Sequence, residues 1–153
     1  MSHRVLLFYG AAVRDRPPEP MNIAEYLEVT ESHCRFLHPN TVSMVESVEL
    51  MTRAIAFCRD QKIRKLLVDA SGLTQLSPPT LVDRFLMVED WARAASGMVI
   101  VAMVWPPKLI HPQKFGIRVA ADLGLRGDVF TSEDEAMAWL LAQTDTHASA
   151  PRA

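Results

Sequence analysis

The chain of 153 residues has only two cysteines, six glycines and no long apolar run. Cys34 and Cys58 allow at most one disulfide, and such low cysteine usage is typical of a reducing compartment, so we expect two buried free thiols in a cytoplasmic protein. No run approaches the roughly 18 apolar residues that cross a bilayer, which predicts no membrane span. A net charge of −2, with the basic residues scattered along the chain, argues against nucleic acid as a partner.

The sequence also lacks the common motifs of enzyme and metal sites. It has no glycine-rich phosphate loop, no nucleophile elbow and no zinc-binding helix motif. In "HCRFLH", Cys34 and His38 share one face of a strand but lie about 13 Å apart at ~3.3 Å per residue, and His33 points to the opposite face. We therefore expect no metal site and no cofactor.

What the sequence contains is one stretch of regular pattern, residues 22–143, without an internal linker. With 49% hydrophobic and 22% charged residues, this stretch is long enough for a single core. Residues 1–21 include the charged, proline-rich "RDRPPEP", and we expect a disordered extension outside the fold. A secretory signal and a true translation start at Met21 are the alternatives. Residues 144–153 are polar and small, which predicts a flexible tail.

Two strands are expected first, at residues 23–29 and 33–38, with a turn at 30–32 between them. A long helix follows, capped by Asn40 or Thr41, in which Ser43 and Glu46 have the spacing of a capping box. Strands at 65–70, 98–105 and 128–130 then alternate with helices that begin after Thr80, at residue 111 and at residue 132. Ser132 and Glu135 are spaced as another capping box, and Gly124 ends the helix before it.

Apolar residues at steps of three and four predict which helix faces are buried. In chain order the four expected faces are Met44, Val48, Met51, Ile55 and Cys58; Leu81, Phe85, Val88, Ala92 and Ala95; Phe115, Val119, Ala120 and Leu123; and Ala136, Trp139 and Leu140.

This order of elements predicts an α/β fold with a mixed, mostly parallel sheet of about five strands, flanked by about four helices. The segment "KLLVDA" has three consecutive apolar residues and no alternation. Such a run is typical of a central strand that is covered on both faces.

Three segments within this order resemble the STAS-like group, the fold of the bacterial anti-sigma-factor antagonists. They are "LLVD" at Leu66–Asp69, "HPQKFGIRVAADLGL" from His111 and "DVFTSEDEAMAWL" from Asp128. The resemblance covers residues 22–143. It implies a non-catalytic regulatory module that binds another protein, a regulator or a kinase, and we expect this function first. A homodimer is a further option.

The resemblance also implies a docking corner at the start of the helix after Asp69. In antagonists of this group a phosphorylatable serine lies there, and counting from Asp69 places that serine position on Pro78, which has no hydroxyl. Ser77 and Thr80 remain as nearby hydroxyls, but a turn residue and a helix cap account for them without a phosphorylation switch, and we favour that interpretation. The expected partner-binding residues are Ser77, Thr80, Asp83 and Arg84.

Asp69 ends the central strand, where functional groups of α/β folds gather. We favour a structural role, in which its carboxylate accepts hydrogen bonds from Ser71 or Gly72 in an Asx-type turn. The alternative is a general base, and this enzyme is the third function that we consider. Candidate partners for such a base are Asp83, Arg84, His111 and Lys114.

A second function, the carriage of a small apolar ligand or lipid, follows from the surplus of methionine and tryptophan. The chain has eight methionines and three tryptophans, many of them on core elements, although core filling is the simpler explanation. Lys108, His111 and Lys114 form a possible cationic rim for an anion, with solvated lysines as the alternative. The methionines and tryptophans concerned are Met87, Met98, Met103, Met137, Trp91, Trp105 and Trp139.

Overall fold

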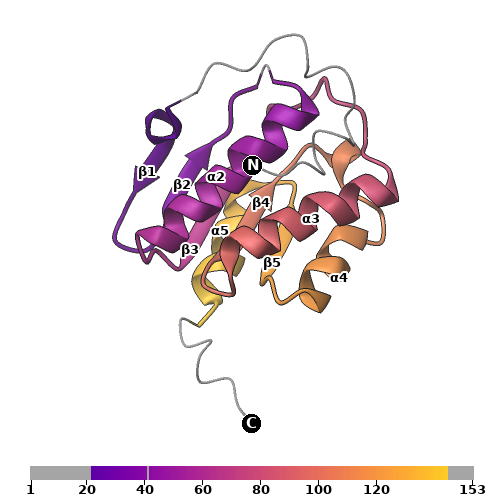
Figure 1. Ribbon diagram of the computed structural model, residues 1–153. Coiled ribbons are helices and arrows are strands. Elements are labelled where there is room, and N and C mark those ends of the chain that lie inside the picture. Colours follow the sequence, from indigo (N-terminus) through magenta and orange to yellow (C-terminus); the bar gives the residue numbers. More distant parts are fainter. Residues whose placement is uncertain (1–21, 41, 145–153) are drawn as a thin grey trace.

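A five-stranded sheet runs through the computed structural model, which describes residues 22–40 and 42–144 (Figure 1). β1 is antiparallel to β2, and every other neighbouring pair is parallel. The predicted mixed, mostly parallel sheet is therefore confirmed, and the strand that ends at Asp69 is its central one. In spatial order the strands are β1 (Leu27–Val29), β2 (Cys34–Leu37), β3 (Lys65–Asp69), β4 (Ile100–Val104) and β5 (Gly127–Phe130).

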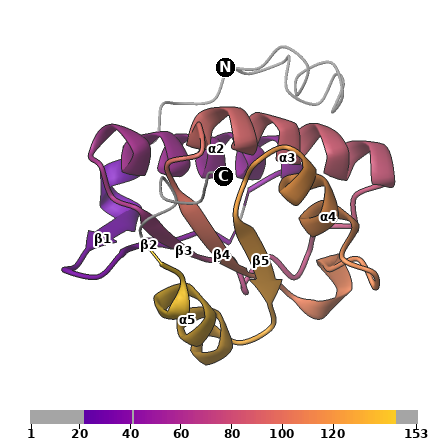
Figure 2. The same ribbon diagram turned by 90° about the horizontal axis from the view of Figure 1, so that it is seen from below.

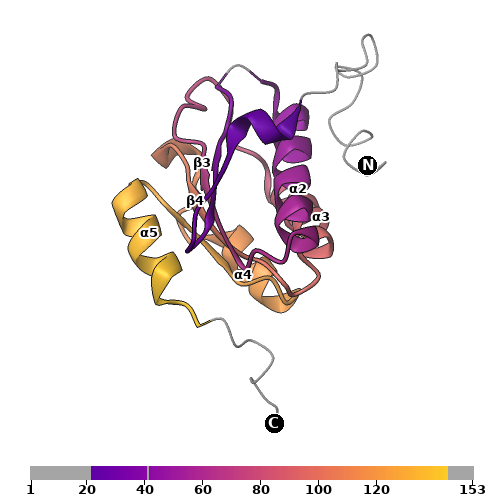
Figure 3. The ribbon, with the colours of Figure 1, turned by 90° about the vertical axis from the view of Figure 1, so that its left-hand side faces the viewer.

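Four α-helices flank the sheet, as predicted: α2 (Met44–Asp60), α3 (Leu81–Ala95), α4 (Phe115–Asp122) and α5 (Glu133–Ala142). Figures 2 and 3 show α2, α3 and α4 on one face of the sheet and α5 on the other. Two short 3₁₀ helices, η2 (Ile23–Tyr26) and η3 (Pro107–Leu109), precede β1 and α4. The predicted extension 1–21, Thr41 and the tail beyond Thr144 lie outside the described residues.

Two hydrophobic cores lie on the two faces of the sheet, because successive side chains of a strand point to opposite faces. On β3, Leu66 and Val68 pack in the large core under α2, α3 and α4, whereas Leu67 packs in the smaller core under α5. All three are fully buried. The unbroken apolar run in "KLLVDA" is thus explained by a strand that is covered on both faces.

The start of the described chain differs from the prediction. Residues 23–26 form a 3₁₀ helix rather than a strand, and Asn22 begins it by accepting a hydrogen bond from the Ala24 amide. α2 is capped by Ser43 rather than by Asn40. The Ser43 hydroxyl accepts from the Glu46 amide at 3.1 Å and the Glu46 carboxylate accepts from the Ser43 amide at 3.0 Å, so the predicted capping box is present and itself sets the helix start.

The predicted buried face of α3 is partly wrong. Leu81 and Phe85 are 49% and 40% exposed, and the helix turns a different stripe inward. This stripe includes Arg84. A hydrophobic pattern counts arginine as a polar, exposed residue, although its guanidinium can bind buried carbonyls, so the pattern did not predict this face. Val88 and Ala95 are buried as predicted, and the stripe consists of Arg84, Met87, Val88, Trp91, Ala94 and Ala95.

α4 is shorter than predicted, since it begins at Phe115 rather than at residue 111. Lys114 precedes it in the left-handed conformation, with φ of 52°, and this residue separates the helix from the turn after Pro112. Val119 and Ala120 are buried as predicted, but Leu123 is exposed. The Ser132–Glu135 capping box predicted at α5 forms in part: the Ser132 hydroxyl accepts a hydrogen bond from the Glu135 amide at 3.0 Å.

Candidate functional site

The corner after β3 is held by the side chain of Asp69. Its Oδ1 accepts hydrogen bonds from the Ser71 amide at 3.2 Å and from the Ser71 hydroxyl at 2.8 Å, which is the turn that the sequence predicts. Gly72 lies directly against the Asn40 side chain, and a Cβ atom at this position would collide with it. The close approach explains why the turn has glycine at position 72.

The other carboxylate oxygen of Asp69 forms an ion pair that sequence reasoning missed. Arg35 donates from Nη2 to Asp69 Oδ2 at 3.0 Å and from Nε to Glu133 Oε2 at 2.8 Å, so it links β2, β3 and α5. This cluster belongs to the α5 side of the sheet. The partners proposed for a general base at Asp69, namely Asp83, Arg84, His111 and Lys114, make their own contacts elsewhere, so the geometry does not bring them to Asp69.

Thr80 caps α3, and Asp83 completes a capping box with it. The Thr80 hydroxyl accepts from the Asp83 amide and the Asp83 carboxylate accepts from the Thr80 amide, both at 3.1 Å. Ser77 and Pro78 lie exposed just before this cap. Thus the residues of the predicted corner do meet at one helix start, with Thr80 and Asp83 already engaged in local structure.

Three apolar side chains are exposed beside this corner. Leu81, Val82 and Phe85 are 49%, 63% and 40% exposed on the first two turns of α3, and we call them the α3 patch. Residues four apart lie next to one another on a helix, so Leu81 and Phe85 form one surface, with Val82 beside them. Two of these residues, Leu81 and Phe85, were predicted to be buried, so the patch was not predicted from the sequence.

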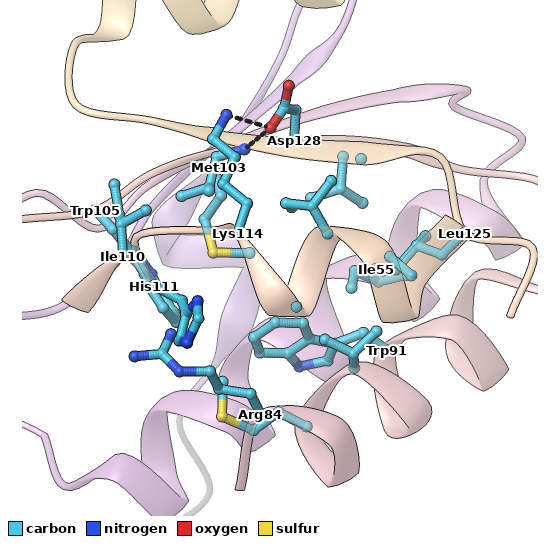
Figure 4. A pocket seen from close by; sticks show the side chains of 18 residues that line it. Ile55, Arg84, Trp91, Met103, Trp105, Ile110, His111, Lys114, Leu125 and Asp128 are labelled. Atoms are coloured by element: carbon cyan, nitrogen blue, oxygen red, sulfur yellow. Dashed lines mark hydrogen bonds and ion pairs between the residues drawn. The ribbon is translucent and has the colours of Figure 1, made fainter. Parts of the chain in front are cut away.

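A cavity of about 70 Å³ lies between α3, α4 and the ends of β4 and β5 (Figure 4). Its walls are apolar and come mostly from buried residues, while Ile110, His111 and Lys114 are half-buried at its edge. The predicted site residues Arg84, His111 and Lys114 all line this cavity, together with four of the methionines and tryptophans that the sequence singled out: Met87, Met103, Trp91 and Trp105. Met98 is exposed, and Met137 and Trp139 pack on the α5 side.

The residues predicted to form a cationic rim, Lys108, His111 and Lys114, have different surroundings in the structure. Lys114 donates to Asp128 Oδ1 at 2.8 Å and its Nζ lies 5.4 Å from the centre of the Phe130 ring, so its charge is neutralised at the edge of the sheet. Lys108 is exposed on η3 and is not part of the cavity wall. His111 accepts a hydrogen bond from the Gln113 amide at Nδ1, which places its ring proton on Nε2.

Arg84 is the charged group that the cavity encloses most completely. It is 7% exposed, donates from Nη1 to the Leu109 carbonyl at 2.8 Å and from Nε to the Pro79 carbonyl at 3.2 Å, and forms no ion pair within the described residues. Burial lowers the pKa of this guanidinium from its usual value, against a weaker opposing effect of Asp83. A buried cation that binds only neutral carbonyls retains capacity for an anion.

Both cysteines are free thiols within the large core, as expected. The hydrogen bond with Cys34, together with burial, raises the pKa of the Cys58 thiol, so this group is not a ready nucleophile. Across the described ranges no three metal-ligating side chains gather in one place, and no helix is both long and apolar enough to cross a membrane.

No protein-family model matches this chain, and no curated protein or solved structure matches it either. The resemblance to the STAS-like group therefore stays a prediction that rests on the three sequence segments.

Proposed function

We propose that the chain is a non-catalytic, STAS-like regulatory module that binds a protein partner through the α3 patch. The exposure of Leu81, Val82 and Phe85 carries this proposal, because large apolar side chains that cluster on a surface are typical of interaction sites. The patch adjoins Ser77 and Thr80, where the resemblance implies docking. The free, buried thiols support a cytoplasmic location for such a module.

Binding at this corner does not need a phosphorylation switch in our proposal. Pro78 occupies the position of the usual phospho-acceptor, and the Thr80 hydroxyl already caps α3. Ser77 precedes a proline in an exposed turn and makes no hydrogen bond with the described residues. The partner is therefore expected to bind the unmodified corner, with the apolar side chains supplying most of the free energy of association.

Site-specific photo-crosslinking tests the proposal. A photoreactive residue at position 82, the most exposed of the α3 patch, should give one defined crosslinked product in a lysate of the source organism. The matched control carries the same residue at position 141 on α5, where Leu141 is 47% exposed and lies on the other side of the sheet. Phe85→Glu should abolish the product from position 82, because a buried unpaired carboxylate is costly.

Three outcomes contradict the proposed partner. Equal products from positions 82 and 141 would mean non-specific apolar contact, and no product from position 82 would remove the docking surface. A product with twice the mass of the chain, matched by a dimer in analytical ultracentrifugation, would replace the partner by a second copy of this chain.

A further inference from the structure

The cavity under α3 and α4 is larger than packing requires. A volume of about 70 Å³ exceeds the share of a water molecule in the liquid, about 30 Å³, and empty space of this kind costs stability. Gly116 in α4 lines the cavity, and a methyl group there would meet only the Val88 Cγ2 atom, at 3.6 Å. Alanine would therefore fit, reduce the void and favour the helix, so the glycine keeps space open at a cost in stability.

Trp105, one of the residues that line the cavity, carries a polar group with no partner among the described residues. The indole Nε1 of Trp105 is buried, and no atom of the described residues accepts its hydrogen bond. Trp105 is 6% exposed and extends beyond the end of β4 into the cavity wall. An unsatisfied buried donor is costly, and native proteins seldom contain one without a ligand, a water molecule or strain that accounts for it.

Further donors lie at the same end of the cavity. Figure 4 shows Arg84, His111 and Trp105 grouped there, away from Leu125 at the opposite end. A guanidinium has five N–H donors, and Arg84 uses one from Nε and one from Nη1, which leaves three. His111 contributes its Nε2 proton. This end therefore offers donors and a positive charge, while the rest of the wall is apolar apart from the ion pair between Lys114 and Asp128.

We propose that this cavity binds a short-chain monocarboxylate. The carboxylate accepts hydrogen bonds from Arg84 and Trp105, and the alkyl chain packs against Trp91 and the two methionines, Met87 and Met103. A single negative charge matches the site, since Lys114 is already neutralised by Asp128 and Arg84 forms no ion pair with any of the described residues. The volume of about 70 Å³ restricts the ligand to one with a short alkyl chain.

This inference concerns a different surface from the α3 patch and does not depend on the proposed function. The second function expected from the sequence is the carriage of a small apolar ligand. The inference assigns a specific site to that function and names the chemical class of the ligand. A failure of photo-crosslinking at position 82 would leave it intact, and the reverse also holds.

Isothermal titration calorimetry with the sodium salts of acetate, butyrate, pentanoate and octanoate tests the site. Affinity should rise by about fourfold per CH₂ up to pentanoate, because each added group is buried, and should stop rising once the cavity is full. Pentanol, which has the same chain without the charge, should bind at least tenfold more weakly than pentanoate. Trp105→Phe removes the N–H donor together with the pyrrole part of the ring, and should weaken pentanoate by about tenfold.

Variants then separate a binding role from a structural one. Trp139→Phe on α5 makes the same change of side chain away from the cavity and should leave binding unchanged. Gly116→Ala should raise stability and weaken pentanoate. Equal binding of pentanol and pentanoate, unchanged affinity in Trp105→Phe or Gly116→Ala, or no saturable binding by the chain at millimolar ligand would each overturn the proposal.

Discussion

His38 illustrates at the scale of one residue how a buried polar side chain is satisfied. It follows β2 and is 2% exposed, and its Nδ1 donates to the Pro39 carbonyl at 2.7 Å. Its Nε2 accepts from the Ser47 hydroxyl at 2.8 Å, which makes the ring the neutral form. Ser47 is 1% exposed, so this serine–histidine pair is closed to substrates and joins β2 to α2 instead.

Stability should fall as the pH drops through the range in which His38 titrates. Burial lowers the pKa of His38 in the folded protein, with interactions with the backbone of Pro39 and of Ser47 opposing it, whereas the unfolded chain has the ordinary value of about 6.5. Between these two values the unfolded state binds more protons, so the stabilisation is complete above about pH 6.5 and is lost below it. Urea unfolding at pH 7.5, 6.5 and 5.5 measures this loss. In His38→Gln the free energy of unfolding should depend less steeply on pH.

His33→Gln serves as the matched control for this pH dependence. Burial also lowers the pKa of His33, but this residue is only half-buried, and its Nδ1 forms a hydrogen bond with the Ser32 hydroxyl beside the β1–β2 turn. Its removal should change the slope of this dependence less than His38→Gln does. If the free energy of unfolding depended on pH as steeply in His38→Gln as in the unaltered chain, His38 would not be the source of the pH dependence.

At the scale of an element, α3 shows what a sequence pattern conceals. Two faces of α3 are apolar enough to be buried, one with Leu81 and Phe85 and one with Met87 and Trp91. Only the position of Arg84 distinguishes them. The structure buries Arg84 and exposes Phe85 because the guanidinium reaches two backbone carbonyls that would otherwise lack partners. Periodicity cannot foresee this, since the carbonyls belong to residues 79 and 109.

Paired substitutions on α3 check the corrected face. Met87→Ala should lower the free energy of unfolding by about 2–5 kcal/mol, because it leaves a void in the large core. Phe85→Ala, two residues away, removes a side chain that is 40% exposed and should cost less than about 1 kcal/mol. Chemical denaturation of both variants gives the difference, and a larger cost for Phe85→Ala would restore the face predicted from the sequence.

Features that depend on neighbouring residues were predictable, and those that depend on distant ones were not. The Ser43–Glu46 capping box, the central strand at Leu66–Asp69 and the order of elements follow from local pattern. Arg84, His111 and Lys114 could be named as candidates from local cues, but only the fold shows that they line one cavity. The link from Arg35 to Glu133 joins residues 98 apart in the chain, and neither residue type signals it.

At the scale of the molecule, the sheet separates two cores of unequal size. Counted over the described residues, the core under α2, α3 and α4 contains 27 buried hydrophobic residues, against six under α5. α5 contributes two buried residues, Ala136 and Leu140, to the smaller core, with Met137 and Trp139 partly buried against it. The Arg35–Glu133 pair, in which Glu133 is 39% exposed, adds little. One layer of the protein is therefore held much less strongly than the other.

We expect α5 to open without the rest of the fold. Native-state hydrogen exchange should give lower opening free energies for amides of Glu133–Ala142 than for those of α2 and α3, because less apolar surface is exposed when α5 detaches. Leu140→Ala should lower the α5 values further by about 2–5 kcal/mol, up to complete loss of protection, and change the α2 values much less. Equal opening free energies in α2 and α5 would instead mean that both layers unfold as one cooperative unit.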